Sequence, residues 1–396
     1  MNTLRIAVAG TLTATALLLS VACTDSSHSN SDSNSSQSQQ PAENERKPQP
    51  TSATILFAGD AMTHQAQLDQ ARKLAGGNGY DFSDCFTLIA PDVRNADYAV
   101  VNLETPLGGG RGGYTGFPCF SAPDSYAVAL RDAGFDLFLT ANNHTLDRSD
   151  AGLRRTIQAL DSLGIPHTGT FKDAQTRSKL VPFIADINGI KVAFLNYTYG
   201  TNGITAKDGA EVSLIDRDAI RREIEASRKA GAELVCVCVH WGVEYQLHEH
   251  ATQRSLTDYL LAQEVDMIIG GHPHVVQPMQ MKQTPSGKRV PVVYSLGNFI
   301  SNMKTDDTRG GALSLVYISR DGSGKVSVDS MAYDTFYAAK PDPAARPGSA
   351  LRNFTVIPSR MADSIPAAQR GWWNTFNTRA TRLFDTENTG VSRRKY

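Results

Sequence analysis

The sequence predicts an α/β fold built around a largely parallel β-sheet. Short apolar runs of strand length alternate along the chain with longer segments that have the periodicity of amphipathic helices. Near-continuous apolar runs are typical of strands buried on both faces, as in parallel sheets covered by helices. In addition, several runs end in a side chain of a type that binds metal ions. These observations together predict a helix-flanked sheet with a functional site at its edge.

Five apolar runs are the predicted parallel strands, at residues 53–59, 96–103, 135–141, 233–239 and 265–270. Each is followed, at once or within a few residues, by Asp, Glu, Asn or His. In open α/β sheets ligands bind at the carboxyl ends of the strands, so we expect these side chains to converge on one edge. The residues concerned are Asp60, Glu104, Asn143, His144, His240, His272 and His274.

Helical patterns fill the gaps between the strands. Three of them are followed directly by a glycine, at Gly134, Gly164 and Gly231, which suits the left-handed conformation that commonly ends a helix. The predicted helices are residues 125–133, 151–163, 216–230 and 252–263.

Two antiparallel hairpins are predicted among the parallel strands. Asn188-Gly189 separates two apolar runs, and this dipeptide favours the tight turn of a hairpin. The second turn is the Gly-rich segment 321–324. The predicted strand pairs are residues 180–187 with 190–196, and 312–320 with 325–333.

The segment Gly271-His272-Pro273-His274 is the strongest single indication of a metal site. Alternate side chains of an extended backbone point to the same side, so His272 and His274 are expected to hold one ion or two adjacent ions. Imidazole suits zinc, iron, manganese and nickel alike, so the pair predicts a metal without identifying it.

Six motifs in a fixed order resemble those of a known family. Over about residues 54–303 the chain is similar to the CapA family of poly-gamma-glutamate capsule biosynthesis, whose domain resembles calcineurin-like metallophosphoesterases. The resemblance implies a two-sheet αββα sandwich of the metallo-dependent phosphatase type. The motifs are Gly59-Asp60-x-Met62, Asn102-Leu103-Glu104, Ala141-Asn142-Asn143-His144, His240-Trp241-Gly242-x-Glu244-Tyr245, Gly271-His272-Pro273-His274-Val275 and Tyr294-Ser295-Leu296-Gly297-Asn298-Phe299.

The resemblance also implies roles for single residues. Glu104 stands where that superfamily places a metal-bridging aspartate, and His144 where a histidine stabilises the departing group. Asp147 either orients the imidazole of His144 or caps the helix beginning near Asp150. The implied cofactor is a divalent Mn, Zn or Fe ion, one or two in number. The implied ligands are Asp60, Glu104, Asn143, His240, His272 and His274.

Four further residues are candidates for contact with substrate or for support of the ligands. Glu244 and Tyr245 follow the motif at His240, and Asn298 lies in the last motif. Arg111 lies in the glycine-rich segment 108–113, from which it could reach an anionic substrate.

Met62 departs from the family pattern. The first motif of the superfamily is Asp-x-His, and a thioether is a poor ligand for hard divalent ions. One metal position is therefore short of a ligand, unless His64, two residues further on, replaces it. Three outcomes remain open: a two-metal enzyme with altered affinity, a one-metal site, or a site that has kept its shape and lost its chemistry.

The N-terminus has the layout of a bacterial lipoprotein signal. Arg5 precedes an apolar stretch, residues 6–19, that is too short for a comfortable membrane span. Leu19-Ser20-Val21-Ala22-Cys23 then resembles a lipobox, although leucine usually occupies the position of Ser20. Cys23 is the predicted lipidated residue, which predicts a lipid-anchored, extracytoplasmic protein of the bacterial cell envelope. Ordinary signal cleavage and an uncleaved anchor are the alternatives.

The predicted organisation has four parts. Residues 24–50 are rich in Ser, Asn, Gln and Pro and cannot bury enough apolar surface to fold, so they form a disordered tether. The parts are residues 1–23, the signal peptide with the lipobox Cys; residues 24–50, the tether; residues 51–340, the CapA-like metallophosphatase-fold domain; and residues 341–396, a C-terminal extension that packs on the domain.

Composition narrows the partners. The 396-residue chain has 41% hydrophobic and 20% charged residues and a net charge of −1, with no long basic block, so no nucleic-acid partner is expected.

Cys236 and Cys238, two apart on one predicted strand, share a face as small core residues. Cys85 and Cys119 could form a disulfide in an oxidising compartment.

Three functional hypotheses remain. The first is a metal-dependent hydrolase that acts on a phosphoester or on an amide of an anionic cell-envelope polymer. The second is a capsule-assembly factor, as the family name implies. The third is a degenerate protein that binds capsule polymer without turnover. The intact His144 favours the first over the third, whereas Met62 favours the third.

Overall fold

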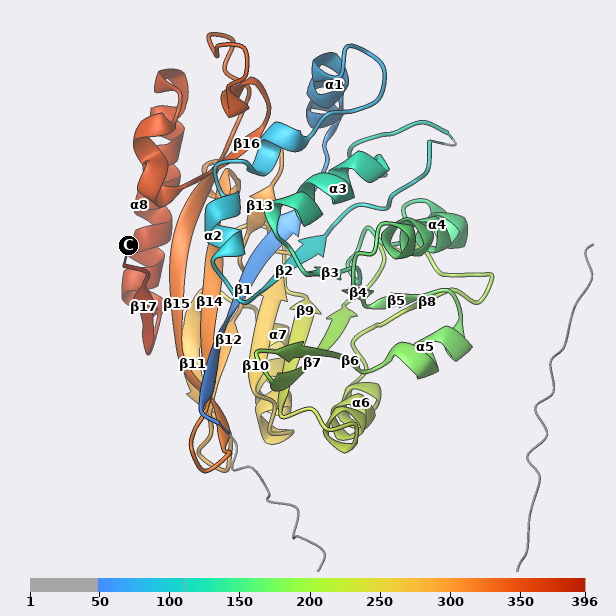
Figure 1. Cartoon of the computed structure of the whole chain (residues 1–396), viewed down its shortest axis with the longest axis vertical. Helices are drawn as coiled ribbons and strands as arrows, with labels where there is room; N and C mark the ends of the chain where they lie inside the picture. The colour runs from blue at the N-terminus through green and yellow to red at the C-terminus, as the bar shows by residue number, and fades with distance from the viewer. Residues whose placement is uncertain (1–48, 111, 396) are drawn as a thin grey trace, which may run out of the picture. The chain divides into compact units, whose positions relative to one another are not determined.

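The side chains of strand β1 (Thr51–Ala61) alternate between two hydrophobic cores. Ile55 and Phe57 point into a core shared with a second sheet, whereas Leu56 and Ala58 point into a core covered by helices. Both faces of the strand are thus buried, as its continuous apolar sequence predicts. This strand lies at the centre of the first of two stacked sheets (Figure 1).

The computed structural model describes residues 49–110 and 112–395. Cys23, the predicted signal peptide and Arg111 lie outside these residues. Within them, no helix has both the length and the apolar character needed to cross a membrane.

The first sheet combines a parallel half with an antiparallel half. Its order is β16-β15-β14-β1-β2-β3-β4, with β13 paired to β1 and β17 to β15. The strands β1 to β4 are parallel, whereas β14 is antiparallel to β1, β15 to β14 and β16 to β15. The bounds are β2 (Tyr98–Leu103), β3 (Leu137–Leu139), β4 (His167–Thr168), β13 (Asn298–Ile300), β14 (Gly310–Arg320), β15 (Val326–Ala339), β16 (Thr355–Pro358) and β17 (Val391–Arg393).

The second sheet has the order β11-β12-β10-β9-β7-β6. Its four inner strands are parallel, and its two edge strands are antiparallel to their neighbours. The bounds are β6 (Phe183–Ile187), β7 (Ile190–Thr198), β9 (Leu234–His240), β10 (Met267–Gly271), β11 (Met279–Gln283) and β12 (Arg289–Val293); β5 (Thr170–Phe171) and β8 (Glu211–Val212) form a separate pair.

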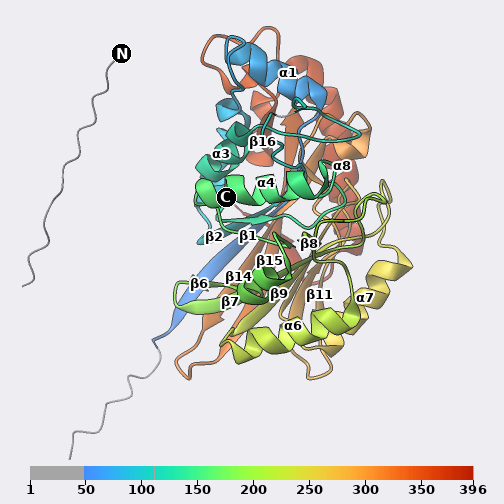
Figure 2. The same ribbon diagram turned by 90° about the vertical axis from the view of Figure 1, so that its right-hand side faces the viewer.

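Helices cover the outer faces of both sheets, so the predicted αββα sandwich is confirmed. Figure 2 shows the strands between α3 and α4 on one side and α6 and α7 on the other. Apolar side chains of these helices belong to the two outer cores. The bounds are α1 (Gln65–Leu74), α2 (Ala90–Arg94), α3 (Asp124–Ala133), α4 (Ser149–Ser162), α5 (Ala174–Leu180), α6 (Arg217–Lys229) and α7 (Ala251–Ala262), with short 3₁₀ turns η1 (Ser83–Phe86), η2 (Asp306–Thr308), η3 (Ala350–Arg352), η4 (Ser359–Ser364) and η5 (Ala367–Gln369).

The predicted helices and hairpins are present with small shifts of their ends. α3, α4, α6 and α7 correspond to the four predicted helices. Gly134, Gly164 and Gly231 all have positive φ, as expected of residues that end helices. Asn188 and Gly189, with φ of 52° and 82°, form the tight turn between β6 and β7. The second predicted hairpin is β14–β15.

The cysteines behave as small core residues or as free thiols. Cys236 and Cys238 lie on the inner face of β9, and both are fully buried, which confirms the predicted shared face. Cys85 is buried and Cys119 is exposed, and both are free cysteines. The disulfide considered from the sequence is therefore not formed in this structure.

The last helix, α8 (Arg370–Glu387), lies alongside β15 and closes one side of the sandwich (Figure 1). Trp373, Phe376 and Phe384 belong to the core between the sheets. β17 then adds a parallel strand to β15. The segment after residue 340 thus supplies part of the main core.

Phe376→Ala tests this dependence on α8. Phe376 is 1% exposed, so removing its ring leaves a cavity and should lower the free energy of unfolding by roughly 3–5 kcal/mol. Urea unfolding followed by circular dichroism measures the loss. Thr378→Ala, on the exposed face of α8, is the control and should stay within about 0.5 kcal/mol of the parent. Equal stabilities of the two variants would contradict the packing role of α8.

Candidate metal centre

The candidate ligands come from both sheets and meet where the strands end. Asp60 lies near the end of β1, Glu104 directly follows β2, and Asn143 follows β3. From the second sheet, His240 is the last residue of β9, and β10 leads into His272 and His274. The site therefore spans the ends of two stacked sheets, whereas the sequence analysis expected one sheet edge.

Two groups of three side chains could each hold a metal ion. One comprises Glu104, His272 and His274, and the other Asp60, Glu104 and His240. In each group the donor atoms lie within 4.8 Å of one another, and all the residues are buried. Glu104 belongs to both groups, so it occupies the position that a bridging carboxylate would need.

Asp60 is held in place by an irregularity of β1 and by two hydrogen bonds. The pairing of β1 with its neighbours shifts register on both sides of Asp60, which turns its side chain towards the site. Its Oδ1 accepts from Asn102 Nδ2 at 2.8 Å, and its Oδ2 accepts from the backbone N–H of His272 at 3.1 Å. Gly59 permits this arrangement, because a Cβ there would lie 1.9 Å from the carbonyl oxygen of Gly297.

His272 and His274 come together through a turn. From the sequence, their side chains were expected to lie on one side because the backbone was expected to be extended. This explanation was wrong. β10 ends at Gly271, and His272 and His274 have φ of 101° and 58°. Their rings lie 5.9 Å apart. Non-glycine residues in such conformations are strained, and the strain is typical of functional sites.

The side-chain amides of Asn298 and Asn143 orient the imidazoles of His274 and His240. Asn298 Oδ1 accepts from His274 Nδ1 at 3.0 Å, which turns Nε2 of that ring towards Glu104 Oε1, 3.9 Å away. His240 Nε2 lies 2.8 Å from Asn143 Oδ1 and 3.5 Å from Glu104 Oε1. Asn143 thus lies beside one ligand group, and Asn298 supports a ligand from behind.

His144 is held by Asp147. The Nδ1–H of His144 donates to Asp147 Oδ2 at 2.8 Å, and the same oxygen accepts from the backbone N–H of Phe120 at 2.7 Å. Asp147 does not cap α4, whose N-cap residue is Arg148, without a side-chain hydrogen bond. Burial lowers the pKa of His144, but the hydrogen bond to Asp147 and the charge of Glu104 outweigh it and raise the pKa above its ordinary value.

Met62 and His64 lie next to the site without joining it. Met62 is 1% exposed, and its thioether is a poor ligand for hard divalent ions. His64 Nδ1 accepts the backbone N–H of Asn302 at 3.2 Å, and its ring packs edge-on against Phe120. Neither ligand group found among residues 49–110 and 112–395 contains His64. The structure therefore gives no support to His64 as a replacement ligand.

Tyrosines line the open side of the site. Glu244 Oε1 lies 3.9 Å from His274 Nε2, and Tyr245, 55% exposed, lies beside the same imidazole. Tyr199, 49% exposed, lies 4.5 Å from the ring of His272 and stacks on His240. These exposed rings are placed where a substrate would approach the ligand groups.

Several residues of the site escaped the sequence analysis. Tyr199 directly follows β7. The rule that functional side chains follow strands would have identified it, but residues 190–196 were interpreted only as one strand of a hairpin. Asn202, three residues later, accepts a hydrogen bond from Asn143 Nδ2 at 3.2 Å. Asn102 donates to Asp60, and its only sequence signal was the motif that contains it. Phe120 contacts His144 edge-on and lies in none of the six motifs.

Burial and neighbouring charges shift the pKa values of the ligands in opposite directions. Burial raises the pKa of Glu104 well above its ordinary value, and the charge of Asp60 raises it further. Burial also opposes ionisation of Asp60, but its interactions with His274 and His240 lower its pKa. Burial lowers the pKa of His240 to about 3 and, with the neighbouring imidazoles, that of His272 to about 2. Both rings are thus neutral, the form that binds metal.

The residues present fit a divalent metal ion. Glu104 Oε1 and His272 Nδ1 are buried and have no hydrogen-bond partner among the described residues. Buried polar atoms without a partner are costly, and an ion bound by these donors would satisfy both. Imidazole nitrogens with carboxylate oxygens suit zinc, iron and manganese.

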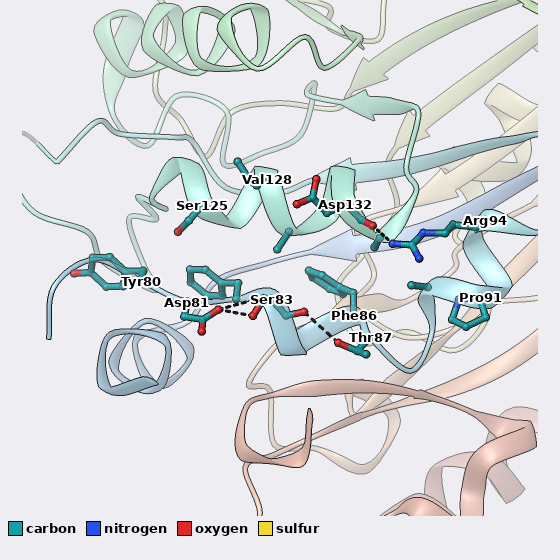
Figure 3. A pocket seen from close by; sticks show the side chains of 14 residues that line it. Tyr80, Asp81, Ser83, Phe86, Thr87, Pro91, Arg94, Ser125, Val128 and Asp132 are labelled. Carbon is teal, nitrogen blue, oxygen red and sulfur yellow. Dashed lines mark hydrogen bonds between the residues drawn. The ribbon is translucent and has the colours of Figure 1, made fainter. Parts of the chain in front are cut away.

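A separate pocket of about 350 Å³ lies between η1, α2 and α3 (Figure 3). Phe82, Phe86 and Val128 line it together with polar residues such as Ser125 and Asp132. None of the candidate ligands lies in its wall. The pocket is therefore distinct from the centre at the strand ends.

Two stacked sheets, outer helices and a buried strand-end group of carboxylates and histidines define a metallophosphatase-like α/β sandwich. The family described as "Bacterial capsule synthesis protein PGA_cap" matches residues 54–303. Because the match spans more than half of the chain, the chain belongs to this family.

Its relatives include two Bacillus proteins, and the predicted membership of the CapA family is confirmed. "Capsule biosynthesis protein CapA" of Bacillus anthracis is 26% identical over 284 residues, which cover 69% of this chain and 66% of that protein. "PGA biosynthesis protein CapA" of Bacillus subtilis (strain 168) is 26% identical over 318 residues, 78% of this chain and 77% of that protein. The chain thus spans just under two thirds of the first relative.

Solved structures that align with this chain include a nucleotidase and a phosphoesterase. The Haemophilus influenzae NAD nucleotidase (NadN) has a TM-score of 0.44 and 13% identity, covering 85% of this chain and 61% of that chain. The calcineurin-like phosphoesterase YfkN from Bacillus subtilis has a TM-score of 0.43 and 13% identity, covering 85% of this chain and 99% of that chain.

We expect His272→Ala/His274→Ala to lose bound metal while the fold remains, because one ligand group then loses both nitrogen donors and Asp60, in the other group, loses its contact with the His274 imidazole. Elemental mass spectrometry of protein purified without chelators or a His tag measures zinc, manganese and iron. His248→Ala, which removes an exposed histidine, is the matched control and should keep its metal. A double variant that retained the full metal content would show that the ligand assignment is wrong.

Proposed function

We propose that this protein is a metal-dependent hydrolase of the bacterial cell envelope that cleaves a phosphoester or amide bond in an anionic polymer during capsule synthesis. The observation that carries the proposal is the buried His144–Asp147 pair beside two ligand groups that share Glu104. The capsule context comes from the family to which the chain belongs. A site that only bound polymer would not need an imidazole fixed by a carboxylate, as His144 is by Asp147.

The proposed ligands are Asp60, Glu104, Asn143, His240, His272 and His274. A divalent ion bound there supplies a Lewis acid that polarises the scissile group and lowers the pKa of water. The buried walls of the site strengthen the electrostatic interactions of the ligands, because little solvent screens them.

His144 is proposed to act on the leaving group. Hydrolysis joins the oxygen of water to phosphorus or to the carbonyl carbon and breaks the bond to the leaving oxygen or nitrogen, which then needs a proton. His144 is suited to donate it, because Asp147 fixes Nδ1 and leaves Nε2 as the donor. The raised pKa of His144 favours the protonated form that this step requires.

The exposed residues around the opening are proposed to contact substrate. Tyr199 and Tyr245 offer flat apolar faces with a hydroxyl at the end. Glu244 Oε1 lies 3.9 Å from His274 Nε2, and its negative charge opposes the approach of a substrate carboxylate on that side. Arg111, outside the described residues, is proposed to meet an anionic group from the glycine-rich segment.

The second candidate function is binding or assembly of capsule polymer without turnover. Met62 favours it, because a buried thioether stands where the superfamily has a histidine ligand. Under this hypothesis the pocket keeps its shape and its metal affinity is reduced. The metal content and the effect of His144 variants distinguish the two functions.

Envelope attachment through Cys23 is part of the proposal. The multiply acylated cysteine of a lipoprotein would anchor the chain, and residues 24–50 would hold the domain away from the membrane surface. The lipobox sequence supports this proposal.

His144→Gln tests the hydrolase hypothesis. If His144 protonates the leaving group, kcat should fall by about 10²- to 10⁴-fold while the metal content stays unchanged. The assay follows release of p-nitrophenol from bis(p-nitrophenyl) phosphate, and chain shortening of poly-gamma-glutamate, with the ion that copurifies. His248→Gln is the control. Equal rates for both variants would remove His144 from the mechanism, and no turnover by the metal-loaded parent would favour the binding function.

Cys23→Ala tests the anchor. In cells that process lipoproteins, this variant should move from the membrane fraction to the soluble extracytoplasmic fraction, because the acylated residue is lost. Fractionation followed by immunoblotting measures the change. Persistence of the variant in membranes would indicate an uncleaved anchor instead.

A further inference from the structure

Two cations lie against one exposed aromatic ring near the beginning of α8, and a third, Lys304, lies on the same loop as one of them. The guanidinium of Arg309 lies 4.3 Å from the centre of the Trp372 ring, and Lys340 Nζ lies 5.5 Å from it. Lys304 belongs to the same loop as Arg309, which donates to its carbonyl oxygen. Burial lowers the pKa of Lys340, and the charges of Arg309 and Lys304 lower it further. We call these four residues, Lys304, Arg309, Lys340 and Trp372, the Trp372 cluster.

The cluster has no acidic partner. Among the residues that the structure describes, no carboxylate forms an ion pair with any of its three cations. The two acidic residues on the same loop, Asp306 and Asp307, face Arg379 instead, at 3.8 and 2.8 Å. Arg309 Nε is buried without a hydrogen-bond partner. Like charges held together without a counter-charge are unfavourable, so the arrangement points to an anionic ligand.

The cluster is also fixed in position. Gln369 accepts from the backbone N–H of Lys340 at 2.9 Å and donates to its carbonyl oxygen at 2.8 Å. Arg309 donates to the carbonyl oxygen of Lys304. Trp372 lies in the first turn of α8, an 18-residue helix, where the helix dipole adds positive potential. A rigid arrangement of donors loses less entropy when it binds a ligand.

One residue links this cluster to the metal centre. Asn298, which accepts from His274, donates through its Nδ2 to Met303 Sδ at 3.4 Å and to the carbonyl oxygen of Thr308 at 3.2 Å. Met303 and Thr308 are the chain neighbours of Lys304 and Arg309. The loop that carries two of the three cations is therefore anchored on the side chain that orients a candidate ligand.

We propose that the Trp372 cluster is an anion-binding site that holds a carboxylate or phosphate group of a polymer while a neighbouring bond of that polymer lies at the metal centre. The position of the reacting bond rests on the proposed function, whereas anion binding by the cluster does not. Lysine and arginine form charge-assisted hydrogen bonds with either anion, and the indole face covers methylene groups of the chain. Carboxylates favour a glutamate polymer and phosphates favour a phosphodiester polymer.

The test is binding of fluorescently labelled poly-gamma-glutamate, and of labelled polyphosphate, to the full-length protein in detergent at low salt. EDTA is present, so that a metal ion does not contribute. Lys304→Gln/Lys340→Gln should weaken binding of the preferred polymer about tenfold, because two charge-assisted contacts are lost. Lys179→Gln/Lys229→Gln removes the same charge from two exposed lysines elsewhere and should bind like the parent. Fluorescence polarisation gives both affinities.

A second readout reports on the cluster itself. The chain has three tryptophans, and Trp241 and Trp373 are buried, at 3% and 6% exposed, so polymer should change chiefly the emission of Trp372. In Trp372→Phe an aromatic ring is still present but the indole that emits is absent, so the emission change should disappear. An emission change that persisted in this variant would place the anion elsewhere.

The outcomes separate this proposal from the proposed function. Weaker binding only in Lys304→Gln/Lys340→Gln supports the anion site, and the preferred polymer identifies carboxylate or phosphate as the anion. Equal affinities of both double variants, or no binding of either polymer to the parent in EDTA, would overturn it. Because binding is measured in EDTA, either result stands whether or not the metal-loaded protein hydrolyses polymer.

Discussion

The burial of two carboxylates determines how the end of the sandwich is built. Asp60 and Glu104 are fully buried, and imidazole nitrogens of His240 and His274 lie 3.4–3.9 Å from their carboxylate oxygens. Two buried negative charges this close repel each other, which is why Asp60 contributes to the raised pKa of Glu104. A divalent cation is the simplest group that stabilises both. This requirement accounts for strands of two different sheets ending at one place, each with a nitrogen or oxygen donor.

Local patterns predicted most of the architecture because they reflect short-range constraints. The alternation of Ile55 and Phe57 with Leu56 and Ala58 follows from a strand buried on both faces. The turn at Asn188-Gly189 follows from the positive φ that its two residues adopt. The strand-end rule collected the six proposed ligands, since any strand that ends in a polar side chain delivers it to the same region.

What the sequence could not provide depends on contacts between distant segments. The conformation of His272 and His274 is set by the hydrogen bond from the His272 amide to Asp60, 212 residues away in the chain. His64 is drawn from the site by the amide of Asn302. Helix α8 was expected only as a docked terminal helix, yet Phe376 lies in the core between the sheets. No local periodicity carries information about these partners.

The presence of Met62 leaves two candidate ligand groups in place, and both of them contain Glu104. Asp60, Glu104 and His240 form a complete group without Met62, and so do Glu104, His272 and His274. Asn298 meanwhile ties His274 to the loop of Lys304 and Arg309, so a change at one end of that loop is felt at the other. Position 62 supplies no nitrogen donor, and the two candidate groups around Glu104 are made of other residues.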